Sequence, residues 1–184
     1  MRVEEITAFL RKNVEPFPPV APYGERYRAS ATLTDGLHLP CVVFESASRY
    51  VDLAIKRFEV TREKKELNIM MDYRAIVRNF VATGNTLNDY DIREVGLSPF
   101  AIPLARAREI SGETSMSWTE FYATMRDGSE FRFGTTFLIE FFEMPEGYTA
   151  NDIQKIIPAV RGETPRIEKI YRERPFFTCY IDGI

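Results

Sequence analysis

The sequence predicts an α+β fold in a single domain over residues 1–184, with a mainly antiparallel sheet of about five strands and helices packed on at least one of its faces. Two observations predict it. Two stretches of alternating apolar and polar residues are each interrupted by an Asp-Gly pair, at 35–36 and at 127–128. Apolar residues also recur at helical spacing in the segments before and between those stretches. Period-two alternation is typical of half-buried strands, whereas spacings of three and four are typical of amphipathic helices.

The first segment is expected to be an amphipathic helix over about residues 3–13, followed by a proline-rich connector. Three prolines within 15–19 fix an extended backbone, so the helix ends before them. Residues 1–26 are therefore predicted to form a helix and connector that pack on the domain. The helix prediction rests on four apolar residues at helical spacing: Val3, Ile6, Phe9 and Leu10.

The alternation around Asp35-Gly36 predicts a hairpin with a three-residue loop at 34–36. A type I turn followed by a glycine in the left-handed region gives such a loop. A two-residue loop would mix the apolar and polar faces of the two strands. The three-residue loop keeps them apart, because it pairs Leu33 with Leu37, Ala31 with Leu39 and Ala29 with Cys41.

Helices are expected next, over about residues 47–83, because an apolar stripe at helical spacing starts at Tyr50. Gly84 is suited to end the last of them. Residues 85–112 show no clean period, and a short helix from near Pro103 to Gly112 fits that segment best.

A second hairpin is predicted around a three-residue loop at 126–128, with its second strand running on to Phe142. The other face of this hairpin then places Tyr122 opposite Arg132, with Trp118 and Glu120 on the same side. The apolar pairs that follow from this loop are Ala123 with Phe131 and Phe121 with Phe133.

The remaining residues predict a helix and a last strand. Thr149 and Asp152 have the spacing of a capping box, which predicts a helix that ends at Pro158. Residues 166–174 fit either a strand or a short helix. The β-branched and aromatic residues of 176–181 predict a strand.

Composition narrows the class of protein. The net charge of −3 makes a nucleic-acid partner unlikely, since phosphate contacts need a basic surface. No apolar run reaches membrane-spanning length, and no leader-like apolar stretch follows Met1, so we expect a cytoplasmic protein without a membrane partner. His38 and Cys41 lie on opposite faces of a regular strand, so no metal site and no cofactor are predicted.

The leading functional hypothesis is a non-catalytic binding or protein-interaction module. Trp118, Tyr122 and Arg132 share one face of the second hairpin and have the composition of an interaction hot spot. The alternative is that helices cover this face and that its aromatic residues are core. Under the binding hypothesis, alanine at Trp118 and Arg132 abolishes partner binding and leaves the fold intact. The partner is an unknown protein or small molecule, and a homo-oligomer is compatible with the sequence.

Two alternatives remain open. Gly84-Asn85 followed by Asp89-Tyr90-Asp91-Ile92 resembles the nucleotidyltransferase pattern, in which a Gly-Ser pair precedes an acid–apolar–acid motif on a strand. The resemblance implies that Asp89 and Asp91 hold a divalent metal for phosphoryl or nucleotidyl transfer, provided that the segment is extended. Otherwise these acidic residues belong to an irregular surface segment.

The second alternative is a small-molecule-binding protein with a pocket between the sheet and the 47–83 helices.

Overall fold

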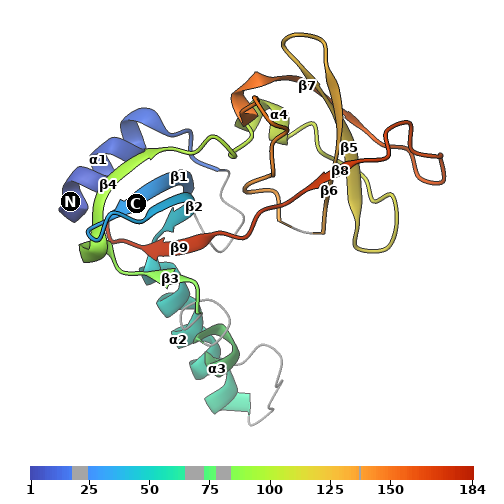
Figure 1. Cartoon of the computed structure of the whole chain (residues 1–184). Coiled ribbons are helices and arrows are strands. Elements are labelled where there is room, and N and C mark those ends of the chain that lie inside the picture. The colour runs from blue at the N-terminus through green and yellow to red at the C-terminus, as the bar shows by residue number, and fades with distance from the viewer. Residues whose placement is uncertain (18–24, 65–72, 78–83, 137) are drawn as a thin grey trace. The chain divides into compact units, whose positions relative to one another are not determined.

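The computed structural model shows an α+β protein with two sheets (Figure 1). By their contacts the residues fall into two compact units, Met1–Gly96 with Phe177–Ile184, and Leu97–Phe176. The prediction of one mainly antiparallel sheet is wrong, because the strands form two sheets and each sheet contains at least one parallel pair. The single domain stays a prediction. The structure describes residues 1–17, 25–64, 73–77, 84–136 and 138–184.

The first unit holds a five-stranded sheet in the order β3-β9-β2-β1-β4. Strands β1 and β2 are antiparallel, whereas β9 runs parallel to both β2 and β3. In Figure 1 the last strand of the chain, in red, lies between two strands from its first half. The predicted strand over 176–181 is confirmed as β9. The strands are β1 (Arg26–Leu33), β2 (His38–Glu45), β3 (Thr86–Leu87), β4 (Ile92–Leu97) and β9 (Phe177–Tyr180).

A tight turn at 34–36 connects β1 to β2. The Leu33 N–H donates to the Leu37 carbonyl at 2.8 Å, and the Gly36 N–H donates to the Leu33 carbonyl at 3.0 Å. Gly36 has a φ of 93°, in the region where side chains are strained and glycine is favoured. The turn thus needs a glycine at its third position.

The register of β1 and β2 changes along their length. Ala31 lies opposite Leu39, as the alternation predicts, but Ala29 lies opposite Val42. The predicted pair of Ala29 with Cys41 is wrong, because an irregularity between Ala29 and Ala31 shifts the register. Such a bulge adds one residue to one strand and moves every pair beyond it.

Helix α1 (Val3–Asn13) confirms the predicted first helix and covers part of the core of this unit. Ile6 and Leu10 are fully buried and belong to the same apolar cluster as Tyr27 and Phe44. Of the predicted connector, Phe17 is buried and forms a bridge with Arg26, while residues 18–24 lie outside the described residues.

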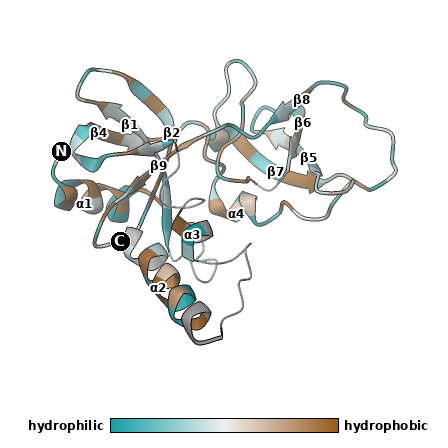
Figure 2. Ribbon diagram, turned by 90° about the horizontal axis from the view of Figure 1, so that it is seen from below, coloured by the Kyte–Doolittle hydropathy of each residue, from teal (hydrophilic) through white to brown (hydrophobic). Residues whose placement is uncertain are grey.

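Helix α2 (Ala47–Lys64) follows β2 and is joined to the sheet by a buried contact. The Tyr50 hydroxyl donates to the Glu45 carboxylate at 2.9 Å, and the Tyr50 ring meets Tyr180 edge-on at 5.6 Å. Burial and the nearby Glu45 carboxylate raise the pKa of Tyr180 to about 12. Hydrophobic and hydrophilic residues both occur along α2 (Figure 2).

Helix α3 (Tyr73–Ile76) is the described part of the helical region predicted to follow. The remaining residues of that prediction, 65–72 and 78–83, lie outside the described residues. None of the helices that the structure describes is long and apolar enough to cross a membrane.

The second unit holds a four-stranded sheet in the order β7-β5-β6-β8. Strand β5 is antiparallel to β6 and β7, and β6 is parallel to β8. The short helix predicted to start near Pro103 is present but ends early. Residues 166–174, which the sequence left open, contain the strand β8. The elements are α4 (Leu104–Ala107), β5 (Thr119–Met125), β6 (Glu130–Thr135), β7 (Ile153–Pro158) and β8 (Ile170–Arg172).

The pairing of β5 with β6 has the predicted register, with Tyr122 opposite Arg132 and Phe121 opposite Phe133. The prediction that this strand continues to Phe142 is wrong, since β6 ends at Thr135. There the Thr135 hydroxyl donates to the Leu138 carbonyl at 2.5 Å, which turns the chain out of the sheet.

The helix predicted after Thr149 is wrong. The capping box with Asp152 is present, but it starts a single 3₁₀ turn (Ala150–Asp152) that leads directly into β7. Ile153 and Ile156 are both buried, and a register irregularity opposite Thr124 lies between them. A bulge therefore explains how a strand shows the three-residue spacing that usually indicates a helix.

The Asp152 cap predicts a loss of stability in acid. Hydrogen bonds from the Thr149 N–H and hydroxyl, each 2.8 Å long, lower the pKa of the Asp152 carboxyl below its ordinary 3.8. A lowered pKa stabilises the fold above the ordinary value, and that stability is lost as the pH falls through the lowered pKa. Asp152→Asn should therefore lower the melting temperature at neutral pH and reduce its fall between neutral pH and the lowered pKa. Equal melting curves for the two proteins at every pH would contradict this.

Candidate functional site

Asp89 and Asp91, the residues predicted for metal binding, lie in a 3₁₀ turn (Asp89–Asp91) between β3 and β4. The extended segment on which that prediction depended is absent at this place. Asn88 donates to the Asp91 carboxylate at 3.0 Å, and the Thr34 N–H donates to the Asp91 carbonyl at 2.8 Å. Among the described residues, no group of three or more His, Cys, Asp or Glu side chains is placed to hold a metal ion.

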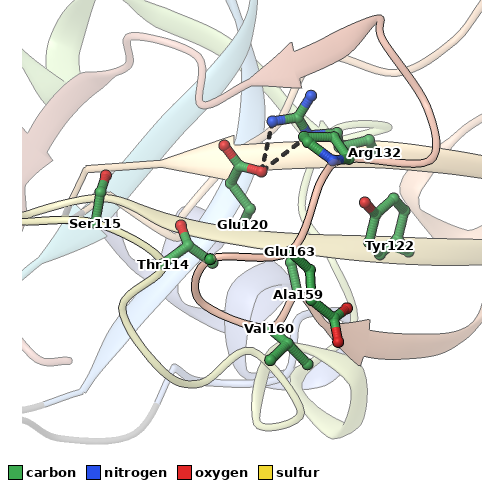
Figure 3. A pocket seen from close by; sticks show the side chains of 10 residues that line it. Thr114, Ser115, Glu120, Tyr122, Arg132, Ala159, Val160 and Glu163 are labelled. Atoms are coloured by element: carbon green, nitrogen blue, oxygen red, sulfur yellow. Dashed lines mark hydrogen bonds and ion pairs between the residues drawn. The ribbon is translucent and has the colours of Figure 1, made fainter.

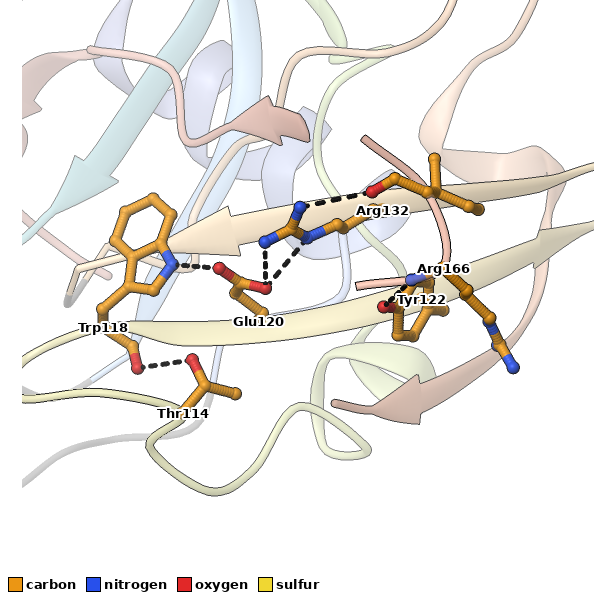
Figure 4. A network of polar contacts seen from close by, with 7 residues as sticks. Thr114, Trp118, Glu120, Tyr122, Arg132 and Arg166 are labelled. Carbon is orange, nitrogen blue, oxygen red and sulfur yellow. Dashed lines mark hydrogen bonds and ion pairs between the residues drawn. The ribbon is translucent and has the colours of Figure 1, made fainter. Parts of the chain in front are cut away.

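The structure brings Trp118 and Arg132 together around one carboxylate, that of Glu120. The Arg132 Nε and Nη2 donate to Glu120 Oε2 at 2.9 and 2.6 Å (Figure 3). The Trp118 indole N–H donates to Glu120 Oε1 at 2.7 Å (Figure 4). The Arg132 and Glu120 side chains are only 13% and 15% exposed. Glu120, which the sequence placed on this face but gave no role, is therefore the centre of the network.

The chain's own segment 159–172 covers much of this face. The Arg166 N–H donates to the Tyr122 hydroxyl at 3.3 Å, and the Arg166 guanidinium lies 4.2 Å from the centre of the Tyr122 ring. The Arg172 guanidinium lies 5.2 Å from the Trp118 ring, and the Ile167 carbonyl accepts from Arg132 at 3.2 Å. The aromatic residues predicted for binding are thus partly covered, by an extended segment and not by helices.

A glycine allows the Trp118 indole to lie across β6. A Cβ atom on Gly134 would be 2.3 Å from Trp118 Cζ2 and 2.6 Å from Ile170 Cδ1, closer than atoms can approach. A glycine inside a strand is a known sign of such a close approach. Gly134 therefore could have indicated from the sequence that a large side chain crosses the strand here.

The turn before β5 forms one wall of the site. Both the Thr114 N–H and the Thr114 hydroxyl donate to the Trp118 carbonyl, at 2.9 and 3.1 Å. Ser117 has a φ of 58°, which few residues other than glycine adopt. The turn places the hydroxyl-bearing residues Thr114 and Ser115 beside Glu120 (Figure 3).

A small polar pocket lies between this turn, β5, β6 and the covering segment (Figure 3). Its volume is about 160 Å³, enough for one side-chain-sized group and not for a nucleotide. It is lined by Thr114, Ser115, Glu120, Tyr122, Arg132, Ala159, Val160, Gly162, Glu163 and Pro165.

The charged groups of the pocket leave it with a net negative charge. Arg132 is neutralised by the ion pair with Glu120, and within the described residues the side chain of Glu163 has no ion pair or hydrogen bond. Hydroxyl oxygens of Thr114, Ser115 and Tyr122 add hydrogen-bond acceptors. The pocket therefore suits a group that carries positive charge and hydrogen-bond donors.

The fold and the site together define an α+β protein with a small acidic pocket on its second sheet. Comparison with models of known protein families finds no match, and neither do comparisons with curated proteins and with solved structures. Its function is therefore inferred from the site alone.

Proposed function

We propose that this protein is a non-catalytic binding module that takes a lysine or arginine side chain of a partner protein into the pocket over Glu120. The observation that carries the proposal is the charge of the pocket. Its basic residue, Arg132, is already paired, while the carboxylate of Glu163 has no partner in the part of the chain that the structure describes. An ammonium or guanidinium group entering the pocket would find both a carboxylate and hydroxyl acceptors.

The arrangement disfavours an anionic ligand. Such a ligand would have to compete with Glu120 for Arg132, which already donates from three nitrogens to Glu120 and to the Ile167 carbonyl. It would also lie near Glu163. Like charges brought together at an interface cost several kcal/mol, which is how charged sites reject wrong partners.

The test uses N-acetyl-lysine amide as the probe and follows its binding by changes in the protein's amide NMR spectrum. We expect saturable shifts at the residues of the pocket, and no saturable shifts with N-acetyl-glutamine amide. Glu163→Gln should weaken binding about two- to fivefold, the effect of an exposed ion pair. Glu168→Gln is the matched control, because Glu168 is exposed, makes the same change of charge and does not line the pocket.

The proposal is wrong if the glutamine probe binds as well as the lysine probe. It is also wrong if Glu168→Gln weakens binding as much as Glu163→Gln. Failure of the lysine probe to saturate at any concentration would equally remove the pocket as a site for a basic side chain.

A second candidate function is favoured by an apolar cavity in the first unit. The cavity has a volume of about 290 Å³ and lies between α2 and α3, so a small apolar molecule would fit. Native mass spectrometry tests this candidate, since a bound molecule would be lost on denaturation. Its lining residues are Tyr50, Val51, Ala54, Ile55, Phe58, Tyr73 and Val77.

Phosphoryl or nucleotidyl transfer at Asp89 and Asp91 stays a prediction from the sequence.

A further inference from the structure

Strand β7 forms one edge of the second sheet, and its outward-facing backbone groups can be identified from its pairing with β5. The Ala159 N–H donates to the Glu120 carbonyl at 3.0 Å, and in an antiparallel pair every second residue makes such bonds. By this alternation, the backbone N–H and carbonyl groups of Ile157 and Lys155 also point toward β5. The N–H and carbonyl of Ile156 therefore point away from the sheet.

The outward N–H of Ile156 is occupied by a side chain. Glu109, just beyond α4, accepts it on Oε2 at 2.8 Å. The other carboxylate oxygen of Glu109 forms an ion pair with Arg106. Buried Leu104 and Ala107 fix α4 in place. The Glu109 oxygen thus lies where the carbonyl of an additional strand would lie.

Space for a peptide lies beside this contact. An open cavity of about 460 Å³ runs along the edge, and it is lined by Arg106, Glu109, Thr124, Gln154, Lys155 and Ile156. Two of these residues are basic and one is acidic, and the acidic one is the residue that blocks the edge. Once the Glu109 carboxylate leaves the Ile156 N–H, Arg106 and Lys155 provide positive charge for an acidic partner.

We propose that the outer edge of β7 binds an extended acidic peptide of a partner protein by strand addition, and that Glu109 closes this edge as an internal competitor. A carbonyl of the peptide accepts the hydrogen bond from the Ile156 N–H. An acidic side chain of the peptide forms an ion pair with Arg106 in place of Glu109. Pro158 has no N–H and ends the donor edge on one side. This site is separate from the pocket over Glu120, so either proposal can fail without the other.

Competition of this kind explains how the protein keeps an exposed strand edge from pairing at random. Native proteins protect such edges with charged side chains, prolines or covering loops. Here the protection is reversible, because Glu109 is held by one backbone N–H and one arginine and its side chain is 32% exposed. A bound acidic strand replaces both the hydrogen bond from the Ile156 N–H and the ion pair with Arg106. A neutral or basic strand replaces only the hydrogen bond.

The test measures binding of a fluorescent, capped peptide of alternating valine and glutamate by fluorescence anisotropy. Glu109→Ala should bind this peptide at least tenfold more tightly than the unmodified protein, because the internal competitor is gone. Glu113→Ala is the matched control. This substitution makes the same change of charge, and Glu113 is exposed and does not line the cavity. A peptide of alternating valine and lysine should bind neither variant.

Backbone pairing is tested by N-methylating the valine–glutamate peptide at alternate residues, which should abolish binding to Glu109→Ala. Glu109→Gln covers the case in which the alanine variant fails to fold, since its amide can still accept the Ile156 N–H. It should bind more tightly than the unmodified protein, because it lacks the ion pair with Arg106. Equal affinity of the unmodified, Glu109 and Glu113 proteins would overturn the proposal. So would undiminished binding of the methylated peptide, or dimerisation of Glu109→Ala without peptide binding.

Discussion

Replacing Phe133 with alanine is expected to lower the free energy of unfolding by about 3–5 kcal/mol, the usual cost of removing a large aromatic residue from a core. Phe133 is fully buried on β6. Its ring stacks on Phe121 at 5.4 Å, and it also meets Phe142 at 6.1 Å and Tyr171 at 5.6 Å. Because these rings come from three segments of the second unit, no single one can move to fill the cavity.

Denaturant unfolding followed by tryptophan fluorescence measures this loss. Trp118 is the only tryptophan and lies in the second unit, so its fluorescence reports on the sheet that contains Phe133. Phe131→Ala is the matched control, since Phe131 is on the same strand and contacts Tyr148 and Tyr171 but is less buried. A loss at Phe131 as large as that at Phe133 would mean that the aromatic cluster is not the core of this unit.

The parts of the fold that are determined by contacts between residues close in the sequence could be predicted from it. The register of Tyr122 with Arg132 follows from the alternation and from one loop length. The helix over residues 3–13 follows from the spacing of its apolar residues. In both cases the residues that decide the structure lie within about twenty positions of each other.

The predictions from the sequence are wrong where the contact that determines the structure joins segments far apart in the sequence, or where a bulge interrupts the regular alternation of a strand. The pairing of β9 with β2 joins segments more than a hundred residues apart, and local pattern carries no information about such a partner. In β7 a capping box and a bulge together imitate a helix, because the Thr149–Asp152 box resembles a helix start and the bulge allows Ile153 and Ile156, three residues apart, both to be buried.

The sequence placed Trp118, Tyr122 and Arg132 on one face of the hairpin but could not give the geometry of their contacts. Trp118, Tyr122 and Arg132 do lie close together, but the residue that joins two of them is Glu120. The sequence also could not show that segment 159–172 returns across this face, since its contacts with Tyr122 and Trp118 are long-range. Sequence reasoning therefore left open an exposed binding face or a face covered by helices, whereas the structure has a small pocket under an extended segment.

This covering changes the expected result of replacing Arg132, which under the binding hypothesis from the sequence leaves the fold intact. Arg132→Met should lower the free energy of unfolding by about 2–4 kcal/mol, because it leaves the mostly buried carboxylate of Glu120 without its ion partner. The Ile167 carbonyl also loses a donor, which loosens the segment that covers the face.

A double-mutant cycle separates the ion pair from the loss of packing. Adding Glu120→Gln to Arg132→Met should recover about half of the lost stability, since a neutral amide can still accept from the Trp118 indole and costs less to bury than a carboxylate. Arg126→Met is the control, because Arg126 is exposed and its guanidinium donates to a backbone carbonyl, that of Asn151, and not to a buried carboxylate. If the two substitutions at Glu120 and Arg132 are additive, or if Arg126→Met costs as much as Arg132→Met, the ion pair does not hold this face together. In that event the stability of the pocket must come from the aromatic contacts of Arg166 and Arg172, and not from Glu120.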